Sequence, residues 1–274
     1  MVIKVPAKVN LRLEIKSIRE DGYHELAMVN SRVSLFDIIT ITEDKENKVI
    51  FSIDELNNIS NNICLNLLND MCNIYNIKKR YSIYIEKHIP QGAGLGGGSC
   101  DAAAILNFID KDNKLKLSLE EKINLGVKYG ADVPYCLIDD VAYVEGIGEK
   151  ITLFNCDIDE NIYLICPRYF TSTKESFNLS KQSNNILTFD EIRHYIKTRD
   201  YKSLFYNGLE EATFLINPRL KEIKEILSNF GCVTMSGSGS SFILIENKKP
   251  SFETLTDCDI YHVKLGKMFW KGVY

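Results

Sequence analysis

Five glycines fall within seven positions near the middle of this chain, in the stretch PQGAGLGGGSCDAA at residues 90–103. The segment before it, YSIYIEKH at residues 81–88, alternates apolar and polar side chains, which predicts a half-buried β-strand. The segment after it, residues 101–109, repeats its apolar side chains at helical spacing, which predicts an amphipathic helix. A strand, a glycine-rich loop and a helix therefore follow one another without a break.

This arrangement favours an anion-binding site. Glycine lets backbone N–H groups turn toward a ligand that no Cβ atom keeps away. The start of a helix adds free N–H groups and the positive end of the helix dipole. Phosphate is the usual ligand of such a loop. The density of glycine between a strand and a helix start argues against a merely flexible surface loop.

Two known kinds of phosphate loop can be compared with this one. No Lys followed by Ser or Thr comes after the last glycine, so it is not a Walker A loop. Gly92, Gly94 and Gly97 fit the pattern G-x-G-x-x-G, but a dinucleotide-binding unit needs a second buried strand after the helix. Residues 111–122 are polar instead. A dinucleotide-dependent oxidoreductase is therefore the weaker alternative.

Composition and charge exclude several classes of protein. The net charge of -4 over 274 residues, without a basic stripe, argues against nucleic-acid binding. No apolar run is long enough to span a membrane, and the N-terminus lacks the apolar core of a signal peptide, so we expect a cytoplasmic protein. The eight cysteines form no C-x-x-C pair and are expected to be reduced and buried. The four histidines show no metal-ligand spacing.

The chain opens as antiparallel β structure. In the first predicted strand, residues 5–15, Lys8 and Asn10 lie on the polar face, which the alternation alone predicts to face solvent. Pro6 predicts an edge or an irregular entry at the start of this strand. The turn REDGYHEL then presents Tyr23 and His24, and two further strands follow, at residues 26–37 and around residues 39–41.

Later segments alternate helices with strands, which predicts an α+β fold. Capping boxes open helices at Ser118 and Thr188, and the first of these helices is predicted to end at Gly130. Asp132 follows at once, and Pro134 is predicted to hold Val133 in an extended conformation. Further helices are predicted at residues 61–77 and 217–230.

A second small-residue loop, SGSGSS at residues 236–241, lies between two predicted strands. It is either a plain hairpin connection or a second wall of the phosphate site, and we favour the second interpretation. The polar, acidic stretch at residues 155–161 is the best domain boundary. We therefore predict an N-terminal domain at residues 1–156 and a C-terminal domain at residues 157–274.

Three separated motifs resemble those of the GHMP kinases, a family of small-molecule kinases: PAKVNL at residues 6–11, the glycine loop, and MSGSGSSF at residues 235–242. DGYHEL at residues 21–26 and GADVPYC at residues 130–136 resemble the branch of this family that acts on a cytidine diphosphate derivative of methylerythritol. The resemblance covers nearly the whole chain. A GHMP-type kinase for a sugar, homoserine or mevalonate remains an alternative.

The resemblance implies a fold and a reaction. The N-terminal half would have the ribosomal S5 domain 2-like fold, and the C-terminal half would be a ferredoxin-like α/β sandwich. ATP and substrate would meet in the cleft between them. The γ-phosphoryl group of ATP would move to the 2-hydroxyl of the methylerythritol part, a step in the non-mevalonate pathway to isoprenoid precursors.

The resemblance also implies roles for individual residues. Asp132 would be the base that accepts the hydroxyl proton, and Lys8 its electrostatic partner, which keeps the carboxylate ionised and steadies the transferring phosphoryl group. Residues implied to bind the substrate are Asn10, Tyr23, His24, Thr173 and Phe177. Residues implied to bind ATP are Lys87, Pro90, Gly92, Gly94, Leu95, Gly96, Gly97, Gly98, Ser99, Cys100, Ser236, Gly237, Ser238 and Gly239.

One position departs from the family pattern. The family usually has Ser-Ser where this chain has Ser99-Cys100, and a thiol is a poor ligand for magnesium. We therefore expect Mg²⁺ to be held mainly by the phosphates of ATP and by water, and we assign no protein ligand to a metal. For the assembly we expect a monomer or a homodimer.

Overall fold

The computed structural model describes residues 1–20, 24–155 and 158–268. These residues form an α+β fold around one 11-stranded sheet, which confirms the predicted fold class. The strands follow the order β3-β4-β2-β11-β7-β10-β9, while β1 pairs with β2 and β8, and β5 pairs with β2 and β6. The predicted domain boundary at residues 156–157 lies outside the described residues and stays a prediction.

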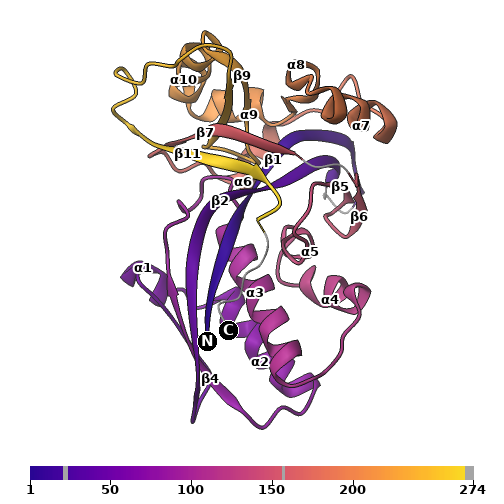
Figure 1. Ribbon diagram of the computed structural model, residues 1–274, viewed down its shortest axis with the longest axis vertical. Coiled ribbons are helices and arrows are strands. Elements are labelled where there is room, and N and C mark those ends of the chain that lie inside the picture. The colour runs from indigo at the N-terminus through magenta and orange to yellow at the C-terminus, as the bar shows by residue number, and fades with distance from the viewer. Residues whose placement is uncertain (21–23, 156–157, 269–274) are drawn as a thin grey trace.

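Two long antiparallel strands, β1 (Val2–Ile18) and β2 (His24–Asp44), run through the length of the molecule (Figure 1). The prediction of two separate strands within β2 was wrong, because β5 pairs with its first half and β4 with its second half. The prediction of a solvent-facing side of β1 was also wrong. Lys8 and Asn10 are 3% and 1% exposed.

The N-terminal half packs its helices on one face of the sheet (Figure 1). The apolar side of β4 (Tyr81, Ile83 and Ile85) is buried as predicted, and it belongs to one core cluster with the inner faces of the two main helices, α2 and α3. The elements are α1 (Asp54–Asn57), α2 (Ile63–Ile74), α3 (Gly97–Asp112), α4 (Leu119–Gly126), α5 (Val133–Cys136), β3 (Lys48–Phe51), β4 (Arg80–Glu86), β5 (Ala142–Gly146) and β6 (Lys150–Leu153).

The C-terminal half is the predicted α/β sandwich. Apolar residues of α10, such as Leu220 and Ile223, pack with Phe242 and Leu244 of β10 in a second core cluster. Strand β11 returns to pair with β7 and also meets β2, which joins the two halves. The elements are β7 (Asp159–Pro167), α6 (Thr173–Leu179), α7 (Phe189–Thr198), α8 (Tyr201–Leu204), β8 (Tyr206–Asn207), α9 (Glu210–Ile216), α10 (Pro218–Ser228), β9 (Gly231–Met235), β10 (Phe242–Glu246) and β11 (Cys258–Gly266).

Local predictions around the helix ends had mixed outcomes. Both capping boxes are present, at the starts of α4 and α7. Helix α4 ends at Gly126, before the predicted Gly130. Val133 is helical rather than extended, because Pro134 lies in the first turn of α5, where a helix needs no N–H from it.

The topology contradicts the dinucleotide-binding alternative. Helix α3 leads into α4 and α5 rather than into a parallel strand. Strand β4, which precedes the glycine loop, pairs antiparallel with β2. Within the described part of the chain, no helix combines the length and the hydropathy that a bilayer crossing requires.

Candidate active site

The glycine loop leads directly into α3. This helix begins at Gly97, four residues before the predicted start, because Gly96 takes the left-handed conformation (φ 64°) at the N-cap position. The first N–H groups of the helix therefore belong to the loop itself, where a phosphate would meet them.

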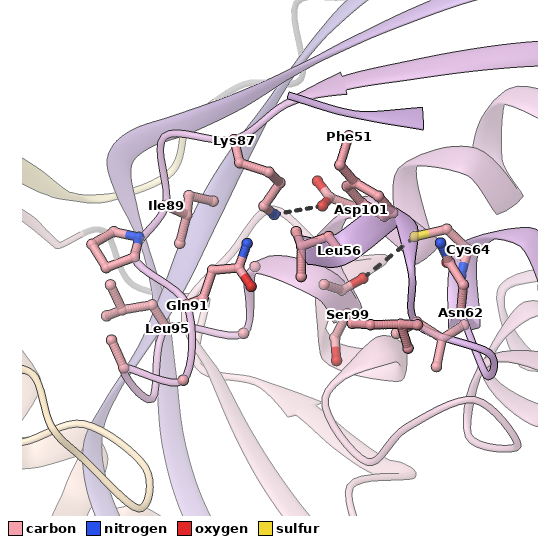
Figure 2. A pocket seen from close by; sticks show the side chains of 18 of the residues that line it. Phe51, Leu56, Asn62, Cys64, Lys87, Ile89, Gln91, Leu95, Ser99 and Asp101 are labelled. Atoms are coloured by element: carbon pink, nitrogen blue, oxygen red, sulfur yellow. Dashed lines mark hydrogen bonds and ion pairs between the residues drawn. The ribbon is translucent and has the colours of Figure 1, made fainter. Parts of the chain in front are cut away.

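A cavity of about 410 Å³ opens in front of this loop (Figure 2). Its floor consists of residues that the resemblance implied, namely Lys87, Pro90, Gly92, Gly94, Leu95, Gly96, Gly97, Gly98 and Ser99. Sequence reasoning missed Ile89, Gln91, Ala93 and Asp101 on this side, and it missed the opposite wall, from β3, α1, α2 and the segment between these helices: Phe51, Leu56, Ile59, Asn61, Asn62, Ile63 and Cys64. The apolar members of this wall look like ordinary core residues in the sequence and its two asparagines like a helix start, so no local signal marks them as a ligand wall.

Lys87 points toward the start of α3 but already has two partners. Its ammonium pairs with Asp101 at 2.7 Å (Figure 2) and also with Asp37. All three side chains are nearly or fully buried. Burial alone would lower the pKa of Lys87, but the two carboxylates raise it above its ordinary value. Lys87 therefore stays charged, with its charge matched by the protein.

The second small-residue loop touches the glycine loop. The Ser236 hydroxyl donates to the carbonyl oxygen of Gly94 (2.9 Å), and it accepts from the backbone N–H of Asn10 (3.1 Å). The N–H of Ser241 donates to the carbonyl oxygen of Ala93 (3.2 Å). The two predicted loops therefore lie together, although 142 residues separate Gly94 from Ser236.

Three further residues implied to bind ATP, and one implied to bind the substrate, accompany this contact. Gly237 lies beside Gly94, and Gly239 closes a turn by donating its N–H to Ser236. Ser238 shares a hydrogen bond with Thr173 at the start of α6, with 2.8 Å between the hydroxyl oxygens. Thr173 therefore reaches the second loop from the other side. Binding of ATP by this loop stays a prediction.

Lys8 and Asp132 form an ion pair, 3.1 Å between Nζ and Oδ2. Asp132 sits at the N-cap position of α5, and its side chain is 31% exposed, whereas that of Lys8 is 4% exposed. The strand segment that carries Lys8 is bounded by two register shifts, after Pro6 and after Asn10. Such bulges re-aim side chains beside active sites.

Asn10 lies next to Lys8 rather than open to a ligand. Its Oδ1 accepts from the Lys8 ammonium (2.9 Å), and its Nδ2 donates to Asn30 (2.7 Å). Because both ends of this amide are used within the protein, substrate contact through Asn10 stays a prediction.

A second cavity, of about 690 Å³, lies beside Ala131, the neighbour of Asp132. His24 and Phe177 line it, with 4.9 Å between their ring centroids and 50° between their planes. Burial lowers the pKa of His24, although a hydrogen bond with the Phe177 backbone opposes this. Tyr23 lies outside the described residues. Sequence reasoning missed the other lining residues: Leu26, Val127, Lys128, Tyr129, Gly130, Ile147, Lys174 and Asn178.

Cys100 lies apart from the residues that line the first cavity. Its side chain is fully buried and points away from the first cavity, with its sulfur 2.8 Å from Cys136 Sγ and 3.1 Å from the Arg32 guanidinium. Burial would raise the pKa of Cys100, but hydrogen bonds with Cys136 and Arg32 lower it to about 7. The thiol therefore does not line the first cavity, and ATP binding by Cys100 stays a prediction. No cluster of three metal-ligating side chains occurs among residues 1–20, 24–155 and 158–268.

Comparisons with known proteins agree with this geometry. The GHMP kinases N terminal domain matches residues 61–143, and the GHMP kinases C terminal domain matches residues 191–254. The chain is 36% identical to the 4-diphosphocytidyl-2-C-methyl-D-erythritol kinase of Caldicellulosiruptor saccharolyticus, over 90% of this chain and 89% of the relative. It is also 36% identical to the kinase of that name from Clostridium tetani, over 87% and 88% of the two chains.

Solved structures give the same result. A crystal structure of 4-(cytidine 5'-diphospho)-2C-methyl-D-erythritol kinase superposes with a TM-score of 0.82 at 26% identity, covering 97% of this chain and 99% of the other. Homoserine kinase from Cytophaga hutchinsonii, at 15% identity, TM-score 0.71, and coverage of 97% and 95%, shares the fold. The chain therefore belongs to the 4-diphosphocytidyl-2-C-methyl-D-erythritol kinases, a branch of the GHMP kinase family, and is an ATP-dependent small-molecule kinase.

Proposed function

We propose that this protein transfers the γ-phosphoryl group of ATP to the 2-hydroxyl of 4-diphosphocytidyl-2-C-methyl-D-erythritol. The observation that carries this proposal is the place of the Lys8–Asp132 pair between the two cavities. On one side, Gly96 of the glycine loop packs on the Lys8 stem so closely that a Cβ there would come within 2.8 Å of it. On the other side, Ala131, next to Asp132, lines the second cavity.

In this mechanism, Asp132 accepts the proton of the attacking hydroxyl as the new P–O bond forms, while the bond between the γ-phosphorus and its bridging oxygen breaks and ADP leaves. Lys8, whose side chain is nearly buried, supplies a fixed positive charge beside the phosphoryl group that is transferred. The loop N–H groups of Gly97 and Gly98, at the start of α3, hold the phosphates of ATP. The protein thus contributes positioning, one base and fixed charge.

The second cavity suits the cytidine end of the substrate. His24 and Phe177 offer two ring faces for a base, and Tyr23 is proposed as a third. The Nε2 atom of His24 is buried and has no hydrogen-bond partner among the described residues, and such an unsatisfied polar atom supports a functional role for this imidazole. The relatives named above support this choice of substrate.

Magnesium is proposed as the partner of ATP. The Cys100 thiol is turned away, so the hydroxyl of Ser99, which lines the first cavity, is the oxygen donor that the loop offers. Mg²⁺ would then be held mainly by the phosphates and would neutralise their charge when bound. One chain supplies every residue invoked here, so the proposed reaction requires no residue from a partner subunit. A monomer or a homodimer in the cytoplasm is therefore proposed.

The test is phosphorus NMR of the protein with ATP, Mg²⁺ and the proposed substrate, comparing wild type with Asp132→Asn. We expect a new phosphomonoester with wild type and a rate roughly 10² to 10⁴ times lower with Asp132→Asn. Asp112→Asn is the matched control, because Asp112 also pairs with a lysine (Lys79, 2.9 Å) and its side chain is 32% exposed, but it lies at the far end of α3. Full activity of Asp132→Asn would refute the assigned base, and turnover of a different alcohol would refute the substrate.

A further inference from the structure

A fully buried amide, Asn30, stands behind the Lys8–Asp132 pair. It lies directly opposite Asn10 in the ladder between β1 and β2 and is 0% exposed. Its Oδ1 accepts a 2.7 Å hydrogen bond from Asn10 Nδ2. The hydrogen-bonded chain therefore runs from Asp132 through Lys8 and Asn10 to Asn30.

The chemistry of lysine determines how both amides are turned. An ammonium group only donates hydrogen bonds, so Asn10 must present its oxygen to Lys8. The NH₂ group of Asn10 then faces the other way and needs an acceptor, which the oxygen of Asn30 supplies. The other atom that this NH₂ group meets, Met28 Sδ at 3.4 Å, is a weak acceptor.

This orientation leaves the NH₂ group of Asn30 without a hydrogen-bond acceptor among the described residues. With its oxygen turned to Asn10, its Nδ2 atom is buried and meets no hydrogen-bond partner within the described ranges. A buried donor left without a partner is unfavourable and rare in folded proteins. A role in packing alone would be better met by an apolar side chain, so the amide is explained by the acceptor that it offers.

Resting on the function proposed above, we propose that Asn30 is a positioning residue for the phosphoryl transfer. By accepting from Asn10, it keeps the Asn10 oxygen on Lys8. Lys8 is thereby held between two acceptors, Asn10 Oδ1 at 2.9 Å and Asp132 Oδ2 at 3.1 Å. Without Asn30, the Asn10 amide is free to turn, and the ammonium loses one of the two contacts that fix it.

The first test is Asn30→Leu, which keeps the approximate volume and removes the acceptor. We expect kcat to fall by at least about tenfold, as a misplaced catalytic group does, while KM for ATP stays within about twofold. Asn30→Asp keeps an acceptor oxygen and should remain within about threefold of wild type. Asn69→Leu is the matched control, because Asn69 accepts from Asn47 (2.9 Å) in a second amide pair near the start of β4, away from the glycine loop.

A double-mutant cycle separates positioning from mere structural support. In an Asn10→Asp background, either carboxylate oxygen can accept from Lys8 and the NH₂ donor is gone, so Asn30→Leu should change kcat by less than about twofold. An equal loss in both backgrounds, or equal losses in Asn30→Leu and Asn30→Asp, would overturn the proposal. If Asn30→Leu fails to fold, the comparison of Asn30→Asp with wild type decides.

The cycle is measured on whichever alcohol the wild-type enzyme phosphorylates. Turnover of an alcohol other than the proposed substrate would refute the proposed function and leave this cycle intact. Normal turnover of the proposed substrate by Asn30→Leu would refute the positioning role alone.

Discussion

Gly94→Ala tests whether the two small-residue loops must touch for the site to form. Gly94 has a φ of +75°, and a Cβ atom added there would lie 2.0 Å from the carbonyl oxygen of Ser236. Ordinary contact begins near 3.4 Å, so the two backbones must separate by roughly 1.4 Å (3.4 − 2.0). No side-chain rotation relieves this clash, because the backbone fixes the position of the Cβ atom and the carbonyl group belongs to the main chain.

The expected loss of stability follows from these contacts. A left-handed conformation costs a residue other than glycine about 1–2 kcal/mol. Separating the loops also weakens two hydrogen bonds, from Ser236 Oγ to Gly94 and from the Ser241 N–H to Ala93, each worth about 1 kcal/mol. The sum is about 3–4 kcal/mol, which lowers Tm by about 6 °C or more in a protein of this size.

Thermal unfolding followed by circular dichroism measures this loss, with Gly98→Ala as the matched control. Gly98 lies inside α3, and a Cβ there would meet only Ile63, at 3.8 Å. Alanine at this position should therefore raise stability by about 0.5–1 kcal/mol through its helix propensity. A Tm for Gly94→Ala within about 2 °C of wild type would refute the argument that the loops are locked together.

Two further predictions concern the placement of Asp132 and the response to acid. Gly148→Ala should lower kcat by at least about tenfold with little change in ATP binding. Gly148 has a φ of +115°, and a Cβ atom there would lie 2.0 Å from the carbonyl oxygen of Ala131, beside Asp132. Steady-state kinetics measure this effect, and an unchanged kcat would contradict it. Asp257→Asn should lower the free energy of unfolding by about 1 kcal/mol at pH 7, because Asp257 pairs with Arg219 at 2.9 Å. That pairing lowers the pKa of Asp257 below its usual value near 3.8, so its contribution is complete above that pH and is lost as pH falls through the lowered pKa. Urea unfolding from pH 7 to pH 3 should show the difference between wild type and variant shrinking in acid; a constant difference would contradict the assignment.

Features with a local physical cause could be predicted from the sequence. The alternation in residues 81–88 predicted the buried side of β4, and two capping boxes predicted the starts of α4 and α7. The glycine loop was recognised because a dense run of glycines between a predicted strand and a predicted helix is typical of few structures. Each of these signals depends on neighbours within a few positions along the chain.

The remaining features depend on contacts between distant segments. The apolar wall formed by Phe51, Leu56 and Ile63 looks like ordinary core, and only the fold shows that a cavity separates it from the glycine loop. The Lys8–Asp132 pair joins positions 124 residues apart (132 − 8), so the sequence alone offered only the family resemblance as a reason to connect them.

The polar face of β1 is buried for a physical reason that becomes visible only when the neighbouring strand β2 is considered with it. In the ladder, Lys8 lies opposite Arg32, and like charges placed opposite each other repel. The two side chains diverge. Arg32 donates to carbonyl oxygens, among them those of Pro6 (3.2 Å) and Cys136 (2.6 Å), whereas Lys8 reaches the carboxylate of Asp132.

A buried cation is tolerated only where such partners exist. Arg32 links β1 to α5 by donating to the backbone carbonyl oxygens of Pro6 and Cys136, which no side-chain substitution removes. The carboxylate of Asp132 pairs with Lys8. The guanidinium thereby holds together β1, which carries Lys8, and α5, whose N-cap residue is Asp132. Buried partners therefore explain why this polar face of β1 does not face solvent, and the Asn10–Asn30 pair, two residues along the ladder, repeats the pattern.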